Sequence, residues 1–146
     1  MENDSYFYYF GYASNLNVAT LEQRLGDKVN YLPGRLIDYG FRFNRKNLDG
    51  SARANIIASD SEDVFGVVYQ IDEKYRDTLL KTEPGYLLIE VPVETDQGNL
   101  RAYTFMSDSD DEDIYPSKDY LDTILAGAKE HKLPEEYTDF IRSLAR

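Results

Sequence analysis

The 146-residue chain contains no cysteine and a single histidine, His131. The absence of cysteine excludes disulfides, thiolate catalysis and cysteine-ligated zinc sites. One histidine cannot by itself form a metal site.

Basic residues are also scarce, with 16 Lys and Arg against 27 Asp and Glu, for a net charge of −11. This balance argues against a nucleic-acid-binding surface, which needs a basic patch, and against a polybasic membrane anchor. The opening "MENDSYFYYF" has no basic region and too short an apolar run for a signal peptide or membrane span. We expect a cytoplasmic protein whose partner is a small molecule or another protein, with no nucleic acid and no membrane.

Hydrophobic residues make up 42% of the chain and aromatic residues 14%, including 13 tyrosines. A chain of this length can bury roughly two thirds of its unfolded surface, so we expect one domain over residues 1–146. Tyrosine has an apolar ring and a polar hydroxyl, and several of these side chains could line a wet cleft as well as the core.

Strand patterns fill the middle of the chain and helix patterns its end, which predicts the α+β class. The expected strands, the first in a central position and the second bent or bulged, are 6–11, 31–45, 52–59, 63–71, 86–94 and 100–106. The expected helices are 17–25, 72–81, 117–131 and one opening at Pro134. Asp72 and Ser117 are expected N-caps, Gly26 a helix stop, and Pro92 the mark of an edge or bulge.

Glu83 is a candidate catalytic residue because it directly precedes Pro84 and Gly85, between a predicted helix and a predicted strand. That position predicts a tight junction. Beside an aromatic neighbour such as Tyr86, removal from water would raise the pKa of Glu83 toward neutrality, where a general base works best. An ordinary surface acid is the alternative interpretation.

The segment Tyr12–Leu16, "YASNL", leads from the first strand into the first helix. Such a turn exposes backbone N–H groups that can bind a carboxylate or carbonyl oxygen. Tyr86, Tyr103 and Tyr120 lie on predicted strand or helix faces that could share one cavity, although core packing is an alternative for each.

Two other functions are not supported. Ser14 is not in a Gly-x-Ser-x-Gly elbow and His131 lies in a charged helical segment, which argues against a serine hydrolase. The acidic segment Asp108–Asp113 lacks the turn glycine and final glutamate of a calcium-binding loop. We expect a mobile, solvated loop that binds no metal.

Taken together, these segments resemble the γ-glutamylcyclotransferase family. "YFGYASNL" is similar to its Tyr-Gly-Ser-Asn-Leu loop, "FGVVYQI" to its Gly-Val-Val strand, and "TEPGYLLIEVPV" to the segment beginning with its catalytic glutamate. "LRAYTFM" and "DYLDTILAGAKEHKLPEEY" resemble the next strand and the terminal helices. The likeness runs from about Tyr6 to Tyr137, and its specificity comes from the order and spacing of the motifs.

The resemblance implies a small closed mixed β-barrel flanked by helices. We expect a monomer or homodimer. It implies release of an amino acid or amine from a γ-glutamyl amide, with the glutamyl part cyclising to 5-oxoproline and no metal or organic cofactor. Glu83 would be the general acid and base. The implied substrate-binding residues are Tyr12, Ala13, Ser14, Asn15, Leu16, Tyr86, Tyr103 and Tyr120.

One position departs from the family pattern, since Ala13 replaces the usual loop glycine. Glycine at this loop position allows a positive φ angle or lets a ligand approach the backbone closely, and a methyl group hinders either. A catalytically silent module that binds a γ-glutamyl or amino-acid-like metabolite is therefore the alternative function. The leaving group stays open among an α-amino acid, the cysteinyl-glycine of glutathione, a lysine ε-amine and a biosynthetic amine.

Overall fold

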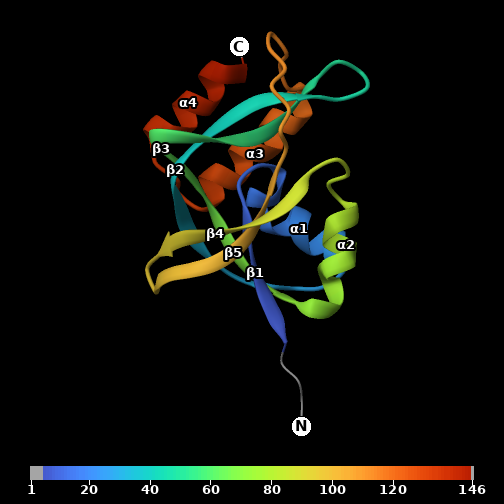
Figure 1. Cartoon of the computed structure of the whole chain (residues 1–146), viewed down its shortest axis with the longest axis vertical. Helices are drawn as coiled ribbons and strands as arrows, with labels where there is room; N and C mark the ends of the chain where they lie inside the picture. The colour runs from blue at the N-terminus through green and yellow to red at the C-terminus, as the bar shows by residue number, and fades with distance from the viewer. Residues whose placement is uncertain (1–4, 146) are drawn as a thin grey trace.

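The computed structural model describes residues 5–145, which form a closed five-stranded β-barrel with four α-helices packed around it (Figure 1). The strands are β1 (Tyr6–Gly11), β2 (Asn30–Lys46), β3 (Ala52–Asp72), β4 (Leu87–Thr95) and β5 (Gly98–Met106). The α-helices are α1 (Val18–Leu25), α2 (Arg76–Lys81), α3 (Lys118–Glu130) and α4 (Glu135–Ala145). Two 3₁₀ turns, η1 (Ser14–Leu16) and η2 (Glu73–Tyr75), precede α1 and α2.

The barrel closes in the order β1-β3-β2-β4-β5, with β1 also beside β5. Its neighbours are antiparallel except for β1 and β5, which run parallel and pair at Tyr9 and Tyr103. The Thr104 hydroxyl donates to the carbonyl of Phe10 at 2.8 Å and adds a second connection between these strands. The expected α+β class and closed mixed barrel are confirmed.

One strand prediction is wrong, because residues 52–59 and 63–71 belong to the single strand β3. Ile37 of β2 pairs with Asp63 and Tyr39 with Ala58, so the polar segment 59–62 bulges opposite Asp38. Since β2 stays paired on both sides of this bulge, the polar residues bend the strand without ending it. The predicted bend in β2 is confirmed, with Asp38 at φ 67°.

Side-chain caps define the helix ends largely as predicted. The Asn17 side chain accepts from the amide of Thr20 at 3.1 Å, and Gly26, with φ 80°, ends α1. The Ser117 hydroxyl accepts from the amide of Tyr120 at 3.3 Å and caps α3. The predicted helix 72–81 is instead η2 followed by α2, although Asp72 caps it as expected.

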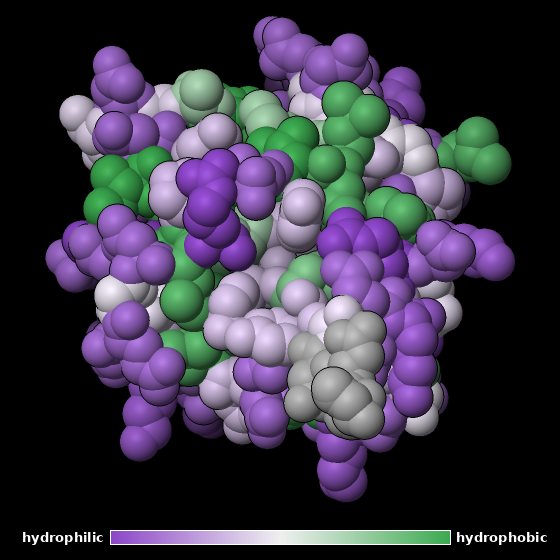
Figure 2. All heavy atoms as spheres, turned by 60° about the horizontal axis from the view of Figure 1, so that its bottom comes forward, coloured by the Kyte–Doolittle hydropathy of each residue, from purple (hydrophilic) through white to green (hydrophobic). Residues whose placement is uncertain are grey.

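The barrel interior and the inner helix faces form one apolar core, whose largest fully buried side chains include Phe10, Phe41 and Tyr69. On β4, Val91 and Val93 are buried and Pro92 is exposed, whereas Leu87 at the strand start is 68% exposed. The face in Figure 2 intersperses apolar side chains among hydrophilic ones. None of the helices in residues 5–145 is long and apolar enough to cross a membrane.

Candidate active site

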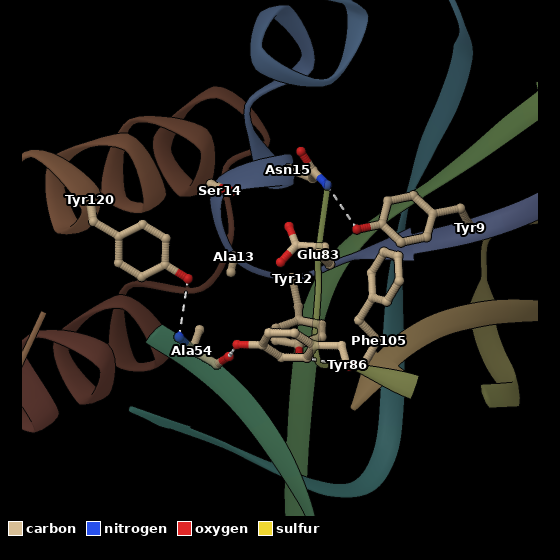
Figure 3. Close-up of a pocket in the computed structure, with 10 residues that line it drawn as sticks. All are labelled: Tyr9, Tyr12, Ala13, Ser14, Asn15, Ala54, Glu83, Tyr86, Phe105 and Tyr120. Carbon is tan, nitrogen blue, oxygen red and sulfur yellow. Dashed lines mark hydrogen bonds between the residues drawn. The ribbon is translucent and has the colours of Figure 1, made fainter. Parts of the chain in front are cut away.

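A narrow pocket of about 20 Å³ lies where β1, β3, β5, α3 and the turn before β4 meet (Figure 3). Its lining is mostly aromatic and amide-bearing, with one carboxylate. The lining residues are Tyr9, Tyr12, Ala13, Ser14, Asn15, Ala54, Glu83, Tyr86, Phe105 and Tyr120.

The loop after β1 forms one wall of this pocket. It continues into η1, whose backbone is held from the core side. The carbonyl of Asn15 accepts from the Tyr69 hydroxyl at 2.6 Å, and the carbonyl of Leu16 is 2.8 Å from Nε2 of His131. The first amides of a helical turn have no partner within the turn, so those of Ser14 and Asn15 are not used by η1 itself.

Arg24 of α1 fixes the side chains of this loop. Its Nη1 donates to Oδ1 of Asn15 at 2.7 Å and to the Ser14 hydroxyl at 3.1 Å. Nδ2 of Asn15 then donates to the Tyr9 hydroxyl at 2.9 Å. The polar groups of the loop are therefore positioned before any ligand binds.

Glu83 lies in a tight turn between α2 and β4, as predicted. The amide of Tyr86 donates to the carbonyl of Glu83 at 3.2 Å, with Pro84 and Gly85 at the two central positions. Gly85 has φ 87°, which suits the third position of a type II turn. A Cβ at Gly85 would also meet the guanidinium of Arg45, so this position requires glycine for two reasons.

The Glu83 carboxylate points toward the segment carrying Ala13 and Ser14 (Figure 3), and its side chain is 11% exposed. Oε1 accepts a hydrogen bond from Arg53, and Oε2 lies 3.8 Å from Nη1 of Arg24. Burial raises the pKa of Glu83 above its usual value, while the nearby arginines oppose that rise. The upward direction of this pKa shift agrees with the expectation from the sequence.

Tyr86 and Tyr120 both hydrogen-bond the backbone of Ala54, which lies on the other wall of the pocket. The Tyr86 hydroxyl donates to the carbonyl of Ala54 at 2.6 Å, and the Tyr120 hydroxyl accepts from the Ala54 amide at 3.0 Å. The Tyr12 hydroxyl donates to the carbonyl of Phe105 at 2.7 Å. Burial raises the pKa of all three tyrosines, so their hydroxyls stay protonated at neutral pH.

Seven of the predicted site residues line the pocket, and two do not. Leu16 is fully buried beneath the loop. Tyr103 lies against Phe7 and Arg76, on the same face of β5 as Phe105 but two residues before it.

Several neighbours of the pocket were not predicted from the sequence. Tyr9, Ala54 and Phe105 line it, and Arg24 and Arg53 contact Glu83 from outside the lining. The alternation of β1 carried a signal for Tyr9, because Tyr9 lies on one strand face with Phe7. No local pattern marked the two arginines.

No group of three or more His, Cys, Asp and Glu side chains within residues 5–145 is arranged to hold a metal ion. The acidic segment Asp108–Asp113 is attached to β2, since the Asp111 amide donates to the carbonyl of Asn44 at 2.9 Å. The Asp111 carboxylate also accepts from the Lys46 amide at 3.1 Å.

The chain is similar to known proteins over nearly its whole length. A γ-glutamylcyclotransferase from Bos taurus is 31% identical over 147 residues, covering 94% of this chain and 78% of the bovine protein. The Homo sapiens protein of that name is 29% identical over 150 residues, with the same coverage. A solved γ-glutamyl cyclotransferase structure superposes with a TM-score of 0.85 at 27% identity, covering 95% of this chain and 88% of its own.

The closed barrel, with a largely buried glutamate facing the loop after β1, has the fold of the γ-glutamylcyclotransferase class. A model of the AIG2-like family matches residues 63–141, more than half of the chain. The protein belongs to this family, and its relatives include γ-glutamylcyclotransferases.

Proposed function

We propose that this protein is a γ-glutamylcyclotransferase that uses Glu83 as its general acid and base. The observation that supports this most strongly is the position of Glu83, a nearly buried carboxylate in the pocket with a raised pKa. The names of relatives that align over most of the chain support the same activity.

The proposed reaction is an intramolecular aminolysis. The α-amine of a γ-glutamyl amide attacks the γ-carbonyl carbon, the new C–N bond closes a five-membered ring, and the amide C–N bond to the leaving group breaks. The products are 5-oxoproline and a free amine or amino acid. Because nucleophile and electrophile belong to one molecule, holding the chain folded provides much of the rate acceleration.

Glu83 transfers the proton in this mechanism. It accepts a proton from the attacking nitrogen and donates it to the leaving nitrogen. Oε2 is the suitable acceptor, because Oε1 is hydrogen-bonded to Arg53 whereas Oε2 is 3.8 Å from the nearest Arg24 nitrogen. The raised pKa makes Glu83 a stronger base than an exposed glutamate.

The loop between β1 and η1 binds the substrate's oxygens in this proposal. The amides of Ser14 and Asn15 lie at the start of η1. The carbonyls of Ser14 and Asn15 accept hydrogen bonds from the Asn17 amide and the Tyr69 hydroxyl. Such amides can stabilise an oxyanion or bind a carboxylate. Tyr12, Tyr86 and Tyr120 shape the cavity around the glutamyl chain.

A silent binding module of the same fold is the second candidate, and two observations favour it. Ala13 places a methyl group in the pocket wall, and the ion pair with Arg53 weakens Glu83 as a base. An assay of 5-oxoproline release from a panel of γ-glutamyl amino acids, peptides and amines separates the two. Release from any of them supports the enzyme, and binding without release supports the module.

We further propose that the protein acts in the cytoplasm without a metal or organic cofactor, as a monomer or homodimer. Activity that survives dialysis against a chelator supports this, and restoration by an added metal after a loss contradicts it. Sedimentation of the purified protein determines the assembly.

A further inference from the structure

Positive charge exceeds negative charge around Glu83. Arg24 of α1, Arg45 of β2 and Arg53 of β3 all act on this one carboxylate, although the chain as a whole carries a net charge of −11. Among the ion pairs of residues 5–145, Arg24 and Arg53 pair with Glu83, and Arg45 pairs with no acid. This surplus of cations favours an anionic ligand group at the pocket.

Arg24 and Arg45 each donate hydrogen bonds to two polar side chains other than Glu83. Arg24 binds the side chains of Ser14 and Asn15 in the loop. Arg45 donates to the hydroxyls of Ser107 and Ser109 at 3.0 and 3.1 Å. Both therefore position neighbouring segments of the chain.

Arg53 is the arginine best placed to bind a ligand. It donates to Glu83, lies beside the Tyr120 hydroxyl, and its guanidinium carbon is 5.2 Å from the centre of the Tyr86 ring. All three of these neighbours line the pocket. The Arg53 side chain is 23% exposed, and a guanidinium has five N–H donors, so its contact with Glu83 leaves others for an anion.

We propose that Arg53 binds the α-carboxylate of the substrate. The proposal rests on the cyclotransferase function, in which Glu83 receives a proton from the α-amine. The α-amine and α-carboxylate are attached to the same carbon, so a carboxylate oxygen lies roughly 3 Å from the nitrogen. An amine in contact with Glu83 thus places its carboxylate beside the cation that already holds Oε1. Arginine recognises carboxylates through paired N–H donors, which fixes their orientation.

Two consequences follow. With the α-carboxylate on Arg53, the amides of Ser14 and Asn15 remain available for the oxygen of the γ-carbonyl, where negative charge develops. A compound whose α-carboxyl is esterified or built into a peptide bond is a poor ligand, because it offers no carboxylate to the Arg53 donors that Glu83 does not use. The substrates are accordingly γ-glutamyl compounds with a free α-carboxylate.

A binding measurement tests this without requiring turnover. N-ethylglutaramate keeps the α-carboxylate and the γ-amide but lacks the α-amine, so it cannot cyclise, and its methyl ester also lacks the negative charge. Calorimetry should show that the wild type binds the acid at least about tenfold more tightly than the ester. Arg53→Met should bring the two affinities within about threefold. Arg53→Lys should give an intermediate ratio, because lysine keeps the positive charge but lacks the paired N–H donors of the guanidinium.

Arg101→Met is the matched control, because it removes one positive charge from an exposed residue paired with Glu90. It should keep the full preference for the acid. The inference is overturned if the wild type binds neither probe, or if Arg53→Met weakens acid and ester equally. Circular dichroism shows whether Arg53→Met folds; if it does not, the ratio for Arg53→Lys decides, and an unchanged ratio overturns the inference.

The assay of 5-oxoproline release is run separately on the wild type. An Arg53-dependent preference without any release would contradict the proposed function and leave Arg53 as the carboxylate-binding residue of a binding module. Release with a preference independent of Arg53 would support the enzyme and contradict the role of Arg53.

Discussion

Gly127 of α3 lies directly against Leu16 of η1: a Cβ at Gly127 would be 2.6 Å from Cβ of Leu16 and 2.8 Å from the backbone nitrogen of Asn17. The helix that carries Tyr120 therefore packs on the turn that forms the opposite part of the pocket. The absence of a side chain at Gly127 sets the distance between them.

Gly127→Ala should separate α3 from η1 and disturb both packing and the pocket. Overpacking of this kind costs about 1–3 kcal/mol, so we expect a lower free energy of unfolding and weaker ligand binding. Urea titration measures the first and calorimetry the second. Ala126→Ser, on the exposed side of the same helix, is the control and should change stability by less than about 0.5 kcal/mol. Wild-type stability in Gly127→Ala would contradict the close packing.

Glu83→Gln tests the proton transfer. Glutamine keeps the shape of the side chain but cannot act as a base, so kcat should fall roughly 10²–10⁴-fold with little change in KM. Glu90→Gln is the control, because Glu90 is exposed and pairs with Arg101, and it should lose far less. Release of 5-oxoproline by Glu83→Gln at the wild-type rate would rule out the mechanism.

The same variant has a pH-dependent effect on stability. In the unfolded chain Glu83 ionises near 4.5, and burial holds its pKa above that value in the folded protein. The folded state therefore binds the extra proton more tightly, and wild-type stability falls as pH rises from 4.5 through the folded-state pKa. Glu83→Gln lacks this titration, so its stability relative to the wild type should increase over that range. Urea unfolding between pH 4 and pH 8 measures the difference, and a relative stability that decreases with rising pH would contradict the raised pKa.

Ala13→Gly tests how the loop methyl affects the ligand. Ala13 has φ −125°, so the backbone here does not require a positive φ, and close approach remains the reason a glycine would matter. The variant should fold normally and turn over bulky γ-glutamyl amides faster than the wild type. Steady-state kinetics on small and bulky substrates provide the measurement. Unchanged constants for every substrate would show that the methyl does not restrict ligand approach.

The acidic segment Asp108–Asp113 should bind calcium no more tightly than millimolar. It lacks the glycine that bends a calcium loop, and one of its carboxylates is hydrogen-bonded to the amide of Lys46. Calorimetric titration with calcium should therefore show no saturable heat at micromolar concentrations. A micromolar site would contradict both the sequence analysis and this geometry.

The sequence allowed most of the elements to be predicted, because their ends carry local signals. Asp72, Ser117 and Gly26 act at helix termini through contacts within a few residues, and the structure confirms them. The continuity of β3 could not be predicted in this way. A run of polar residues such as 59–62 is equally typical of a loop and of a β-bulge. Only the pairing of the residues on both sides of it with β2 distinguishes the two.

Only part of the site was predicted, because local motifs are visible in the sequence and long-range contacts are not. Glu83 and the loop after β1 stood out because a turn motif surrounds each. Tyr103 was predicted because it matches a tyrosine of the family's pocket, whereas Phe105, two residues later on the same face of β5, packs its ring against Tyr9 and lines the pocket. Arg53 lies in a strand and resembles any exposed arginine until the fold brings it to Glu83.

The connection between the first and last strands governs when the pocket can exist. The bond from Thr104 to Phe10 joins residues 94 positions apart, and that from Tyr12 to Phe105 joins residues 93 apart. Loop closure over such a distance costs more entropy than closing the β2–β3 hairpin, so we expect this seam to form late in folding. During synthesis, a chain with β1, β2 and β3 already paired still lacks the aromatic wall that Phe105 provides. We therefore expect that a ligand can bind only after the barrel has closed and that a bound ligand would stabilise this seam.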